Sequence, residues 1–222
     1  MRVLLVRHGE NPANVHHILS FRKADFRLTA RGREQAVRLR SVLALGPETR
    51  YWASPLRRAR HTAGLLAPYG TAIEIMEELR ELDVGLLDGS GKAVDRQTYY
   101  QVIEAWRSGR AQTRFPGGED LFDATARLRF ALRHIVSSTS EATAVVVGHG
   151  GLFTEGLLQL LDPAGRSAFQ AAWEPRWLNC EAAEFSAGCD DAGEVNLTWR
   201  GWLGRTHDTT ATPTQDQEQR YE

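Results

Sequence analysis

Two histidines stand just beyond runs of residues that are typical of buried strands. His8 follows the apolar residues 3–6, His149 follows the apolar residues 144–147, and a glycine comes directly after each histidine. A short aliphatic run that ends at glycine indicates a buried strand. Ligands of open α/β sheets bind at the carboxyl ends of the strands, so two parallel strands would bring both imidazoles to one crevice. An imidazole there could be a base or a nucleophile near neutral pH.

The arginine before the first histidine adds a group that binds anions. Arg7 directly precedes His8, and a guanidinium can hold two oxygens of a phosphate or carboxylate at once. It can also offset the negative charge that develops during phosphoryl transfer. Gly9 lets backbone atoms approach a ligand closely. These residues alone favour anion chemistry only weakly, because a histidine at a strand end is more often a structural residue.

The composition narrows the classes of partner. The chain has 222 residues, of which 42% are hydrophobic and 25% charged, and its formal net charge is -1. These values are typical of a globular protein, and the balanced charge argues against nucleic-acid binding by bulk electrostatics. An anion site must therefore be a local cluster. Arginine would supply it, since lysine occurs only at Lys23 and Lys92.

Patterns that would indicate a metal, a cofactor or another compartment are missing from the sequence. Cys180 and Cys189 match no metal-ligand spacing and no disulfide framework, and the adjacent His16 and His17 have no partnering ligands nearby. We therefore expect no metal and no cofactor. No stretch resembles a signal peptide or approaches the roughly 20 apolar residues of a membrane span. We expect a cytoplasmic protein that does not bind membranes.

Strands and helices are predicted to alternate along the chain. The expected strands cover residues 3–6, 50–53, 71–76, 144–147, 180–185 and 195–202. The expected helices cover residues 30–45, 54–67, 92–108, 119–136 and 152–161. This order predicts an α/β fold, a three-layer α/β/α sandwich with a mainly parallel sheet of about six strands and an antiparallel edge strand.

Local signals set the expected ends of these elements. Ser54 before Pro55 is typical of a helix N-cap, and Asp162-Pro163 is expected to close the last helix. Residues 11–27 and 77–91 are expected to be loops.

Blocks of the sequence, taken in order, resemble the motifs of one known family. They read VRHGE (6–10) with Asn14 nearby, LTARGREQA (28–36), SPLRRARHTA (54–63), LRELDVG (79–85), PGGE (116–119) and VGHGG (147–151). Asn179-Cys180 is similar to a late block of the same family. The chain therefore resembles the histidine phosphatase superfamily, the phosphoglycerate-mutase-like proteins, from residue 2 to about residue 200.

The resemblance implies a nucleophile and an acid. His8 is the implied nucleophile, which attacks phosphorus in line and becomes a phosphohistidine. Glu81 is the implied acid, which protonates the leaving oxygen and then activates water. General acid help of this kind typically contributes about 10²–10⁴-fold in rate. Acidic residues nearby compete for this role, and alignment on the Leu-Arg-Glu block favours Glu81 over Glu77, Glu78, Asp83 and Asp88.

The resemblance also implies a set of phosphate-binding groups. Arg7, Arg58 and His149 are the implied clamp on the phosphoryl oxygens, and we expect two guanidiniums and an imidazolium to neutralise the bound group. Asn14 and Gly150 are further expected contacts. The choice of Arg58 over Arg57 rests on the family pattern, because adjacent residues lie about 100° apart around a helix and only one points into the crevice.

One stretch departs from the family. Many members carry an Arg-x-Gln-Gly stretch shortly after the asparagine, and this chain has residues 18–21 there. We therefore expect a bulkier and more apolar approach to the site. Ser20, Phe21 and Arg22 are the candidates for contact with the substrate, and Lys23 lies beside them.

A single phosphoglycerate-mutase-like domain is expected over residues 1–203, with residues 84–118 as a short cap or insert over the site. Residues 204–222 are polar, and we expect a disordered tail. The aromatic residues near the end of the domain should pack in the core or at the sheet edge, and could also form the contact of a homodimer. They are Trp173, Trp177, Trp199 and Trp202.

These residues favour one function among three. We expect a metal-independent phosphatase that hydrolyses the phosphate monoester of a small phosphorylated substrate through a phosphohistidine on His8. The alternative is phosphoglycerate-mutase-type transfer, but mutases of the family carry a longer insertion than the short stretch 85–115. A non-catalytic binding domain on the same fold is less favoured, because every expected catalytic position is filled.

Overall fold

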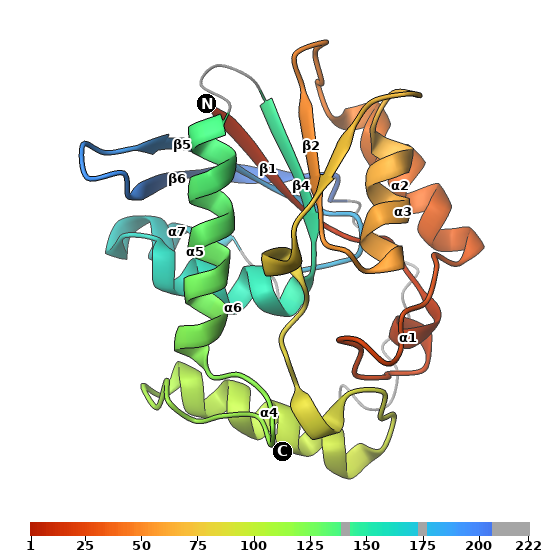
Figure 1. The fold of residues 1–222 in the computed structure, drawn as a ribbon, viewed down its shortest axis with the longest axis vertical. Coiled ribbons are helices and arrows are strands. Elements are labelled where there is room, and N and C mark those ends of the chain that lie inside the picture. Colours follow the sequence, from red (N-terminus) through yellow and green to blue (C-terminus); the bar gives the residue numbers. More distant parts are fainter. Residues whose placement is uncertain (139–142, 173–176, 206–222) are drawn as a thin grey trace.

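The centre of the computed structural model is one six-stranded sheet in the order β3-β2-β4-β1-β5-β6 (Figure 1). The structure describes residues 1–138, 143–172 and 177–205. The strands are β1 (Arg2–Arg7), β2 (Arg50–Ala53), β3 (Ile73–Ile75), β4 (Thr143–Gly148), β5 (Ala182–Cys189) and β6 (Val195–Leu203). The neighbours β3-β2-β4-β1 are all parallel, and the hairpin β5-β6 adds the antiparallel edge.

The register of the two central strands brings the two histidines to one edge. β1 and β4 pair in parallel as far as Arg7 opposite Gly148. His8 and His149 are the residues that directly follow β1 and β4. They therefore leave the sheet side by side at its carboxyl edge, as the sequence predicts.

Alternate residues of the strands pack on opposite faces of the sheet. In β1, Val3 and Leu5 belong to one hydrophobic cluster, whereas Leu4 and Val6 belong to another. All four side chains are fully buried. This pattern requires helices on both faces, because an uncovered face would leave the apolar side chains in water.

Helices supply both covers and complete the predicted three-layer sandwich (Figure 1). On one face lie α2 (Ala30–Val42) and α3 (Arg57–Leu66), and on the other lie α5 (Leu121–Ser138), α6 (Gly150–Leu160) and α7 (Pro163–Ala171). At one end of the molecule lies α4 (Ala93–Arg107), with the short helix α1 (Pro12–Val15) and the 3-10 turns η1 (Glu77–Leu79) and η2 (Gly85–Leu87) elsewhere in the loops. Among the described residues, no helix is both long enough and apolar enough to cross a membrane.

Helix α4 is bound to α6 by an ion pair. Arg107 of α4 lies 2.5 Å from the carboxylate of Glu155, which is only 5% exposed. Because removing one partner of such a pair leaves a buried charge uncompensated, the contact holds α4 against the body of the protein.

Three local features differ from what the sequence predicts or were missed. α3 begins at Arg57 and has no side-chain cap, since the Ser54 hydroxyl contacts His149 instead. The helix before Asp162-Pro163 does end there, at Leu160, but the sequence analysis missed α7, whose N-cap Asp162 accepts from Gly165 N. Within the expected loop 11–27, the Asn11 side chain caps the short helix α1.

Aromatic rings fill the space between α7 and the hairpin β5-β6. The fully buried Phe169 lies 5.1 Å from Trp199, 5.6 Å from Trp202 and 6.3 Å from Trp177, measured between ring centroids. These tryptophans therefore pack in the core and at the sheet edge, which was the first of the two expectations. Trp173 and the tail from residue 206 lie outside the described residues.

Replacing Phe169 with alanine is expected to lower the free energy of unfolding by about 3–5 kcal/mol, because it opens a cavity among these rings. The matched control is Phe130→Ala on α5, whose side chain is 51% exposed, and we expect a change within about 0.5 kcal/mol. Urea unfolding followed by tryptophan fluorescence measures both. Equal effects of the two substitutions would contradict the packing described here.

Candidate active site

The contacts of His8 fix which of its ring nitrogens carries a proton. Nδ1 lies 2.8 Å from Gly9 O, and Arg58 Nε lies 3.1 Å from Nε2. A carbonyl oxygen only accepts, so Nδ1 carries the hydrogen and donates it. Nε2 then holds the lone pair and accepts from the guanidinium. The nitrogen available for attack on an electrophile is therefore Nε2.

Burial and positive charge keep this ring neutral. His8 is only 3% exposed. Burial, followed by the charges of Arg58 and Arg7, lowers the pKa of His8 well below its ordinary value, while the bond to Gly9 acts in the opposite direction. The imidazole is thus unprotonated at neutral pH, as a nucleophile must be.

Arg58 is a buried cation that donates hydrogen bonds to the neutral groups of His8 and Ser20. It is 2% exposed, and besides His8 it donates to Ser20 Oγ at 2.8 Å and Ser20 O at 2.7 Å. Burial lowers the pKa of Arg58 to about 10, so the group stays charged at neutral pH. Arg57, the alternative, has a side chain that is 63% exposed and lies 3.9 Å from Asp25. Arg58 is therefore the arginine beside His8.

His149 lies against His8, with 5.1 Å between the ring centroids. Its Nε2 is 2.8 Å from Ser54 Oγ, and its buried Nδ1 has no hydrogen-bond partner within the described part of the chain. Burial first, and then the charge of Arg58, lowers the pKa of His149 well below its ordinary value. The expected imidazolium is therefore a neutral imidazole in this structure, because a third cation in this buried cluster is unfavourable.

Arg7 reaches the same region past a glycine. Its Nη1 donates to Trp177 O, and its charge acts on both histidines. A Cβ atom on Gly150 would lie 3.2 Å from Arg7 Cδ. The absence of a side chain at position 150 therefore makes room for the guanidinium.

The side chains of Asn14 and Asn179 support the loop that follows β1. Asn14 Oδ1 accepts from Asn11 N and from Asn179 Nδ2, each at 3.2 Å. Asn179 Nδ2 also donates to His8 O at 2.8 Å. These contacts use the amide oxygen of Asn14 and leave its Nδ2 group as the donor that could reach a ligand.

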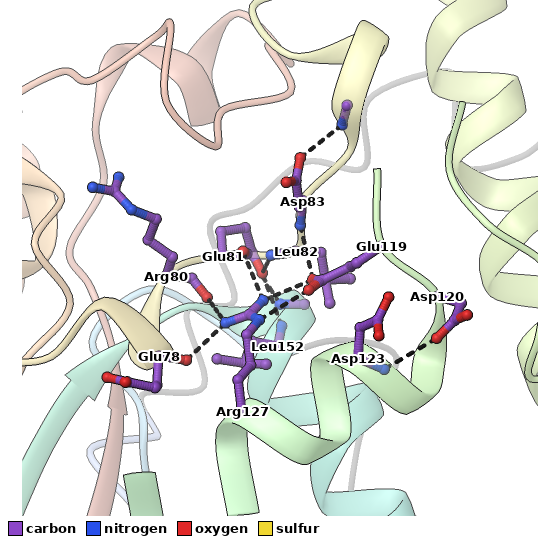
Figure 2. Close-up of polar contacts among 12 residues, drawn as sticks. Glu78, Arg80, Glu81, Leu82, Asp83, Glu119, Asp120, Asp123, Arg127 and Leu152 are labelled. Carbon is purple, nitrogen blue, oxygen red and sulfur yellow. Dashed lines mark hydrogen bonds and ion pairs between the residues drawn. The ribbon is translucent and has the colours of Figure 1, made fainter. Parts of the chain in front are cut away.

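The carboxylate of Glu81 contacts the amino end of α6 (Figure 2). The N-cap residue of that helix is His149. Oε1 accepts from Leu82 N and Leu152 N, both at 2.8 Å, and Oε2 accepts from Gly151 N at 3.2 Å. The amino end of a helix favours negative charge. The carboxylate is therefore held in place by backbone N–H groups.

The carboxylates of three of the other acidic candidates bind other groups. Glu77 forms a surface pair with Arg80 at 2.7 Å, and Asp83 Oδ1 accepts from Gly85 N at 3.0 Å. The buried Asp88 accepts from three successive backbone N–H groups, those of residues 21, 22 and 23, at 2.8 to 2.9 Å. Asp88 thus sets the path of the loop at residues 21–23.

The three candidates for substrate contact on this loop differ in their surroundings. The hydroxyl and carbonyl oxygens of Ser20 both accept from Arg58, so Ser20 helps to hold the guanidinium in place. Phe21 is 7% exposed and belongs to the main hydrophobic cluster. Its ring centroid lies 5.1 Å from the guanidinium carbon of Arg22 and 5.9 Å from that of Arg80. Of the three, Arg22 is the exposed side chain.

Several supporting residues have roles that the sequence analysis missed. Ser54 has the clearest signal, since it directly follows β2 at the same sheet edge. Thr62 accepts from Gly9 N at 3.0 Å, and Asp88 lies far from its loop in the sequence, so neither contact has a local signal. In the described residues, no three His, Cys, Asp or Glu side chains gather in a way that could hold a metal ion.

Comparison with known proteins gives matches over most of the chain. A family model described as the histidine phosphatase superfamily (branch 1) matches residues 3–185. A probable phosphoglycerate mutase, GpmB, from Salmonella paratyphi C (strain RKS4594) is 31% identical over 155 residues, which are 68% of this chain and 70% of the relative.

Solved structures of the same shape include two named phosphatases. A mycobacterial glucosyl-3-phosphoglycerate phosphatase, in complex with VO3, has a TM-score of 0.69 and 28% identity, with 90% of this chain and 98% of that chain covered. The alpha-ribazole phosphatase from Shigella flexneri has a TM-score of 0.69 and 25% identity, with 92% and 96% covered. The family match and these likenesses show that the chain belongs to the histidine phosphatase superfamily.

Proposed function

We propose that this protein is a metal-independent phosphatase that hydrolyses a phosphate monoester through a phosphohistidine on His8. The observation that carries the proposal is the state of that ring. Nδ1–H is bound to Gly9 O, and the lone pair of Nε2 faces Arg58 in a buried, positively charged site. A neutral imidazole beside a guanidinium suits attack on a phosphoryl group, because the nucleophile and the charge that binds the substrate are adjacent.

The first step forms a bond between His8 Nε2 and phosphorus and breaks the ester P–O bond. The electron pair of that bond passes to the leaving oxygen, which takes a proton from the carboxyl group of Glu81 and departs as an alcohol. The ring becomes positively charged, and Gly9 O stabilises that charge by accepting from Nδ1–H. Arg58 and Arg7 bind the phosphoryl oxygens, and His149 donates from the buried Nδ1 that has no partner in the described residues.

The second step returns the enzyme to its starting state. Glu81, now a carboxylate, takes a proton from water while the water oxygen attacks phosphorus. The P–N bond breaks, its electron pair returns to His8 Nε2, and inorganic phosphate leaves. A protonated carboxyl group has one O–H donor and keeps acceptor lone pairs. Glu81 can therefore carry the proton on Oε2, which has the longer contact, while Oε1 stays bound to Leu82 N and Leu152 N.

The named relatives support both phosphatase and mutase chemistry. Two structural relatives are phosphatases, one of them in complex with VO3. The GpmB relative favours the second candidate, phosphoryl transfer back to the substrate. Both reactions begin with the same phosphohistidine, so the fate of the phosphoryl group distinguishes them.

Replacing His8 with alanine is expected to lower kcat for p-nitrophenyl phosphate by at least about 10³-fold, because the nucleophile is lost. Phosphate release by the unmodified protein should persist with EDTA present. The control is His134→Gln, an exposed histidine paired with Glu74 on the surface, which should leave activity unchanged.

The assay should include 3-phosphoglycerate, glucosyl-3-phosphoglycerate and α-ribazole 5'-phosphate. Isomerised 3-phosphoglycerate without net phosphate release would favour the mutase. Activity that survives in His8→Ala would overturn the role of His8. Lack of turnover together with no trapped phosphoenzyme would favour a binding domain.

The two buried imidazoles are expected to titrate well below pH 6.5, the ordinary histidine pKa being about 6.5, because burial and arginine charges lower the pKa of His8 and His149. Inorganic phosphate should raise both pKa values, since a bound anion favours the protonated rings. NMR titration of protein labelled at the histidine rings, assigned with His8→Asn and His149→Asn, measures this. Midpoints at or above pH 6.5 without phosphate would contradict the described environment.

A further inference from the structure

We propose that Arg127 is a positioning residue that holds the main chain on which the acid Glu81 is carried, and that Glu119 is its partner. The inference rests on the proposed function, because it concerns the proton donor of that reaction. Arg127 lies on α5, and none of the motifs discussed above contains it. Its role is visible only in the folded chain.

The guanidinium of Arg127 binds three backbone carbonyl groups of residues 78–81 (Figure 2). Nη1 donates to Glu78 O at 2.7 Å and to Arg80 O at 2.6 Å, and Nη2 donates to Glu81 O at 2.9 Å. Nε and Nη2 also donate to the two carboxylate oxygens of Glu119 at 2.9 and 2.7 Å. The backbone before and at Glu81 is therefore tied to one rigid, planar group.

Glu119 fixes the chain on the other side of the acid. Its Oε1 accepts from Asp83 N at 2.8 Å, and its backbone N donates to Asp83 O at 3.0 Å. The glycines of the PGGE block allow this contact, because a Cβ on Gly118 would lie 2.1 Å from Asp83 O. Arg127 and Glu119 together hold the backbone from residue 78 to residue 83.

Helix α5, which carries Arg127, packs on α6, the helix that His149 caps. Leu128, next to Arg127, lies against Gly156 of α6, where a Cβ would be 2.5 Å from Leu128 Cδ2. His149 is the N-cap of α6. The position of Glu81 relative to His149 is thus supported both by the packing of α5 on α6 and by the direct contacts of the carboxylate with Gly151 N and Leu152 N.

The energetics of the pair favour a geometric role over a stabilising one. The side chains of Arg127 and Glu119 are only 18% and 9% exposed. A buried ion pair contributes little net stability compared with apolar packing. An aliphatic side chain could not bind three carbonyl oxygens, and a lysine cannot reproduce the planar fork. What the pair supplies is the position of the main chain at Glu81, and the N–H groups at the end of α6 then orient the carboxylate.

The test is the dependence of phosphoenzyme formation on the leaving group. A misplaced acid slows transfer from phenyl phosphate, whose leaving oxygen needs a proton, but hardly slows transfer from 2,4-dinitrophenyl phosphate, whose leaving oxygen does not. For Arg127→Lys we expect rapid-quench rate constants to fall about tenfold or more with phenyl phosphate, as part of the effect of general acid catalysis. The dinitrophenyl ester should change less than about threefold.

Three further variants make the result specific. Glu119→Gln should give the same pattern with a smaller effect, and it guards against failure of Arg127→Lys to fold. Combining Arg127→Lys with Glu81→Gln should cost no more than Glu81→Gln alone, since residues that act as a unit are not additive. The matched control is Arg2→Lys, an arginine that binds Glu184 through Nε and Nη2 and the carbonyl of Ala44 through Nη1 at the far end of β1, and it should leave both rates unchanged.

The outcomes separate this role from the proposed function. Equal slowing of both esters, or additive losses in the double variant, would overturn the positioning role while the phosphohistidine still forms. If the unmodified protein forms no phosphohistidine with either ester, the proposed function fails and the role of Arg127 fails with it.

Discussion

A buried guanidinium bound to neutral groups is the constraint around which the site is built. Arg58 is 2% exposed and donates to Ser20 and His8, none of whose contacting atoms is charged. Burying a charge is unfavourable, and no carboxylate is among these hydrogen-bond partners. The neutral dipoles, together with the more distant charges of Glu81, Asp25 and Asp88, favour the charged guanidinium, whereas Arg7 acts against it. The depressed pKa values of His8 and His149 express the same constraint. A dianionic phosphoryl group is the kind of ligand that relieves it.

Much of this arrangement could be predicted because its signals are local. The apolar runs before His8 and His149 define two neighbouring parallel strands, and the motif blocks single out Arg58 and Glu81. The three-layer sandwich follows from the alternation of strands and helices. These features depend on residues close together in the sequence or on patterns shared by a whole family.

The features that could not be predicted depend on partners far away in the sequence. Ser54 has the sequence of a helix cap, yet its hydroxyl contacts an imidazole 95 positions later. Ser20 looks like a substrate contact, but Arg58 uses both of its oxygens. Asp162-Pro163 marks both the end of α6 and the start of α7, and the reason that a second helix follows is the packing of Phe169 on the distant hairpin. The anchoring of Glu81 on α6 likewise requires knowing which loop meets that helix.

Asp88 fixes the path of residues 21–23 in a way that does not depend on the side chains of these residues. The carboxylate binds backbone N–H groups of three successive residues, and any amino acid other than proline has such a group. Arg22 and Lys23 are exposed, so their replacement would leave the loop path and Arg58 undisturbed. The chain thereby combines a fixed loop path next to Arg58 with interchangeable surface groups, an arrangement in which side chains can change in evolution without loss of the loop.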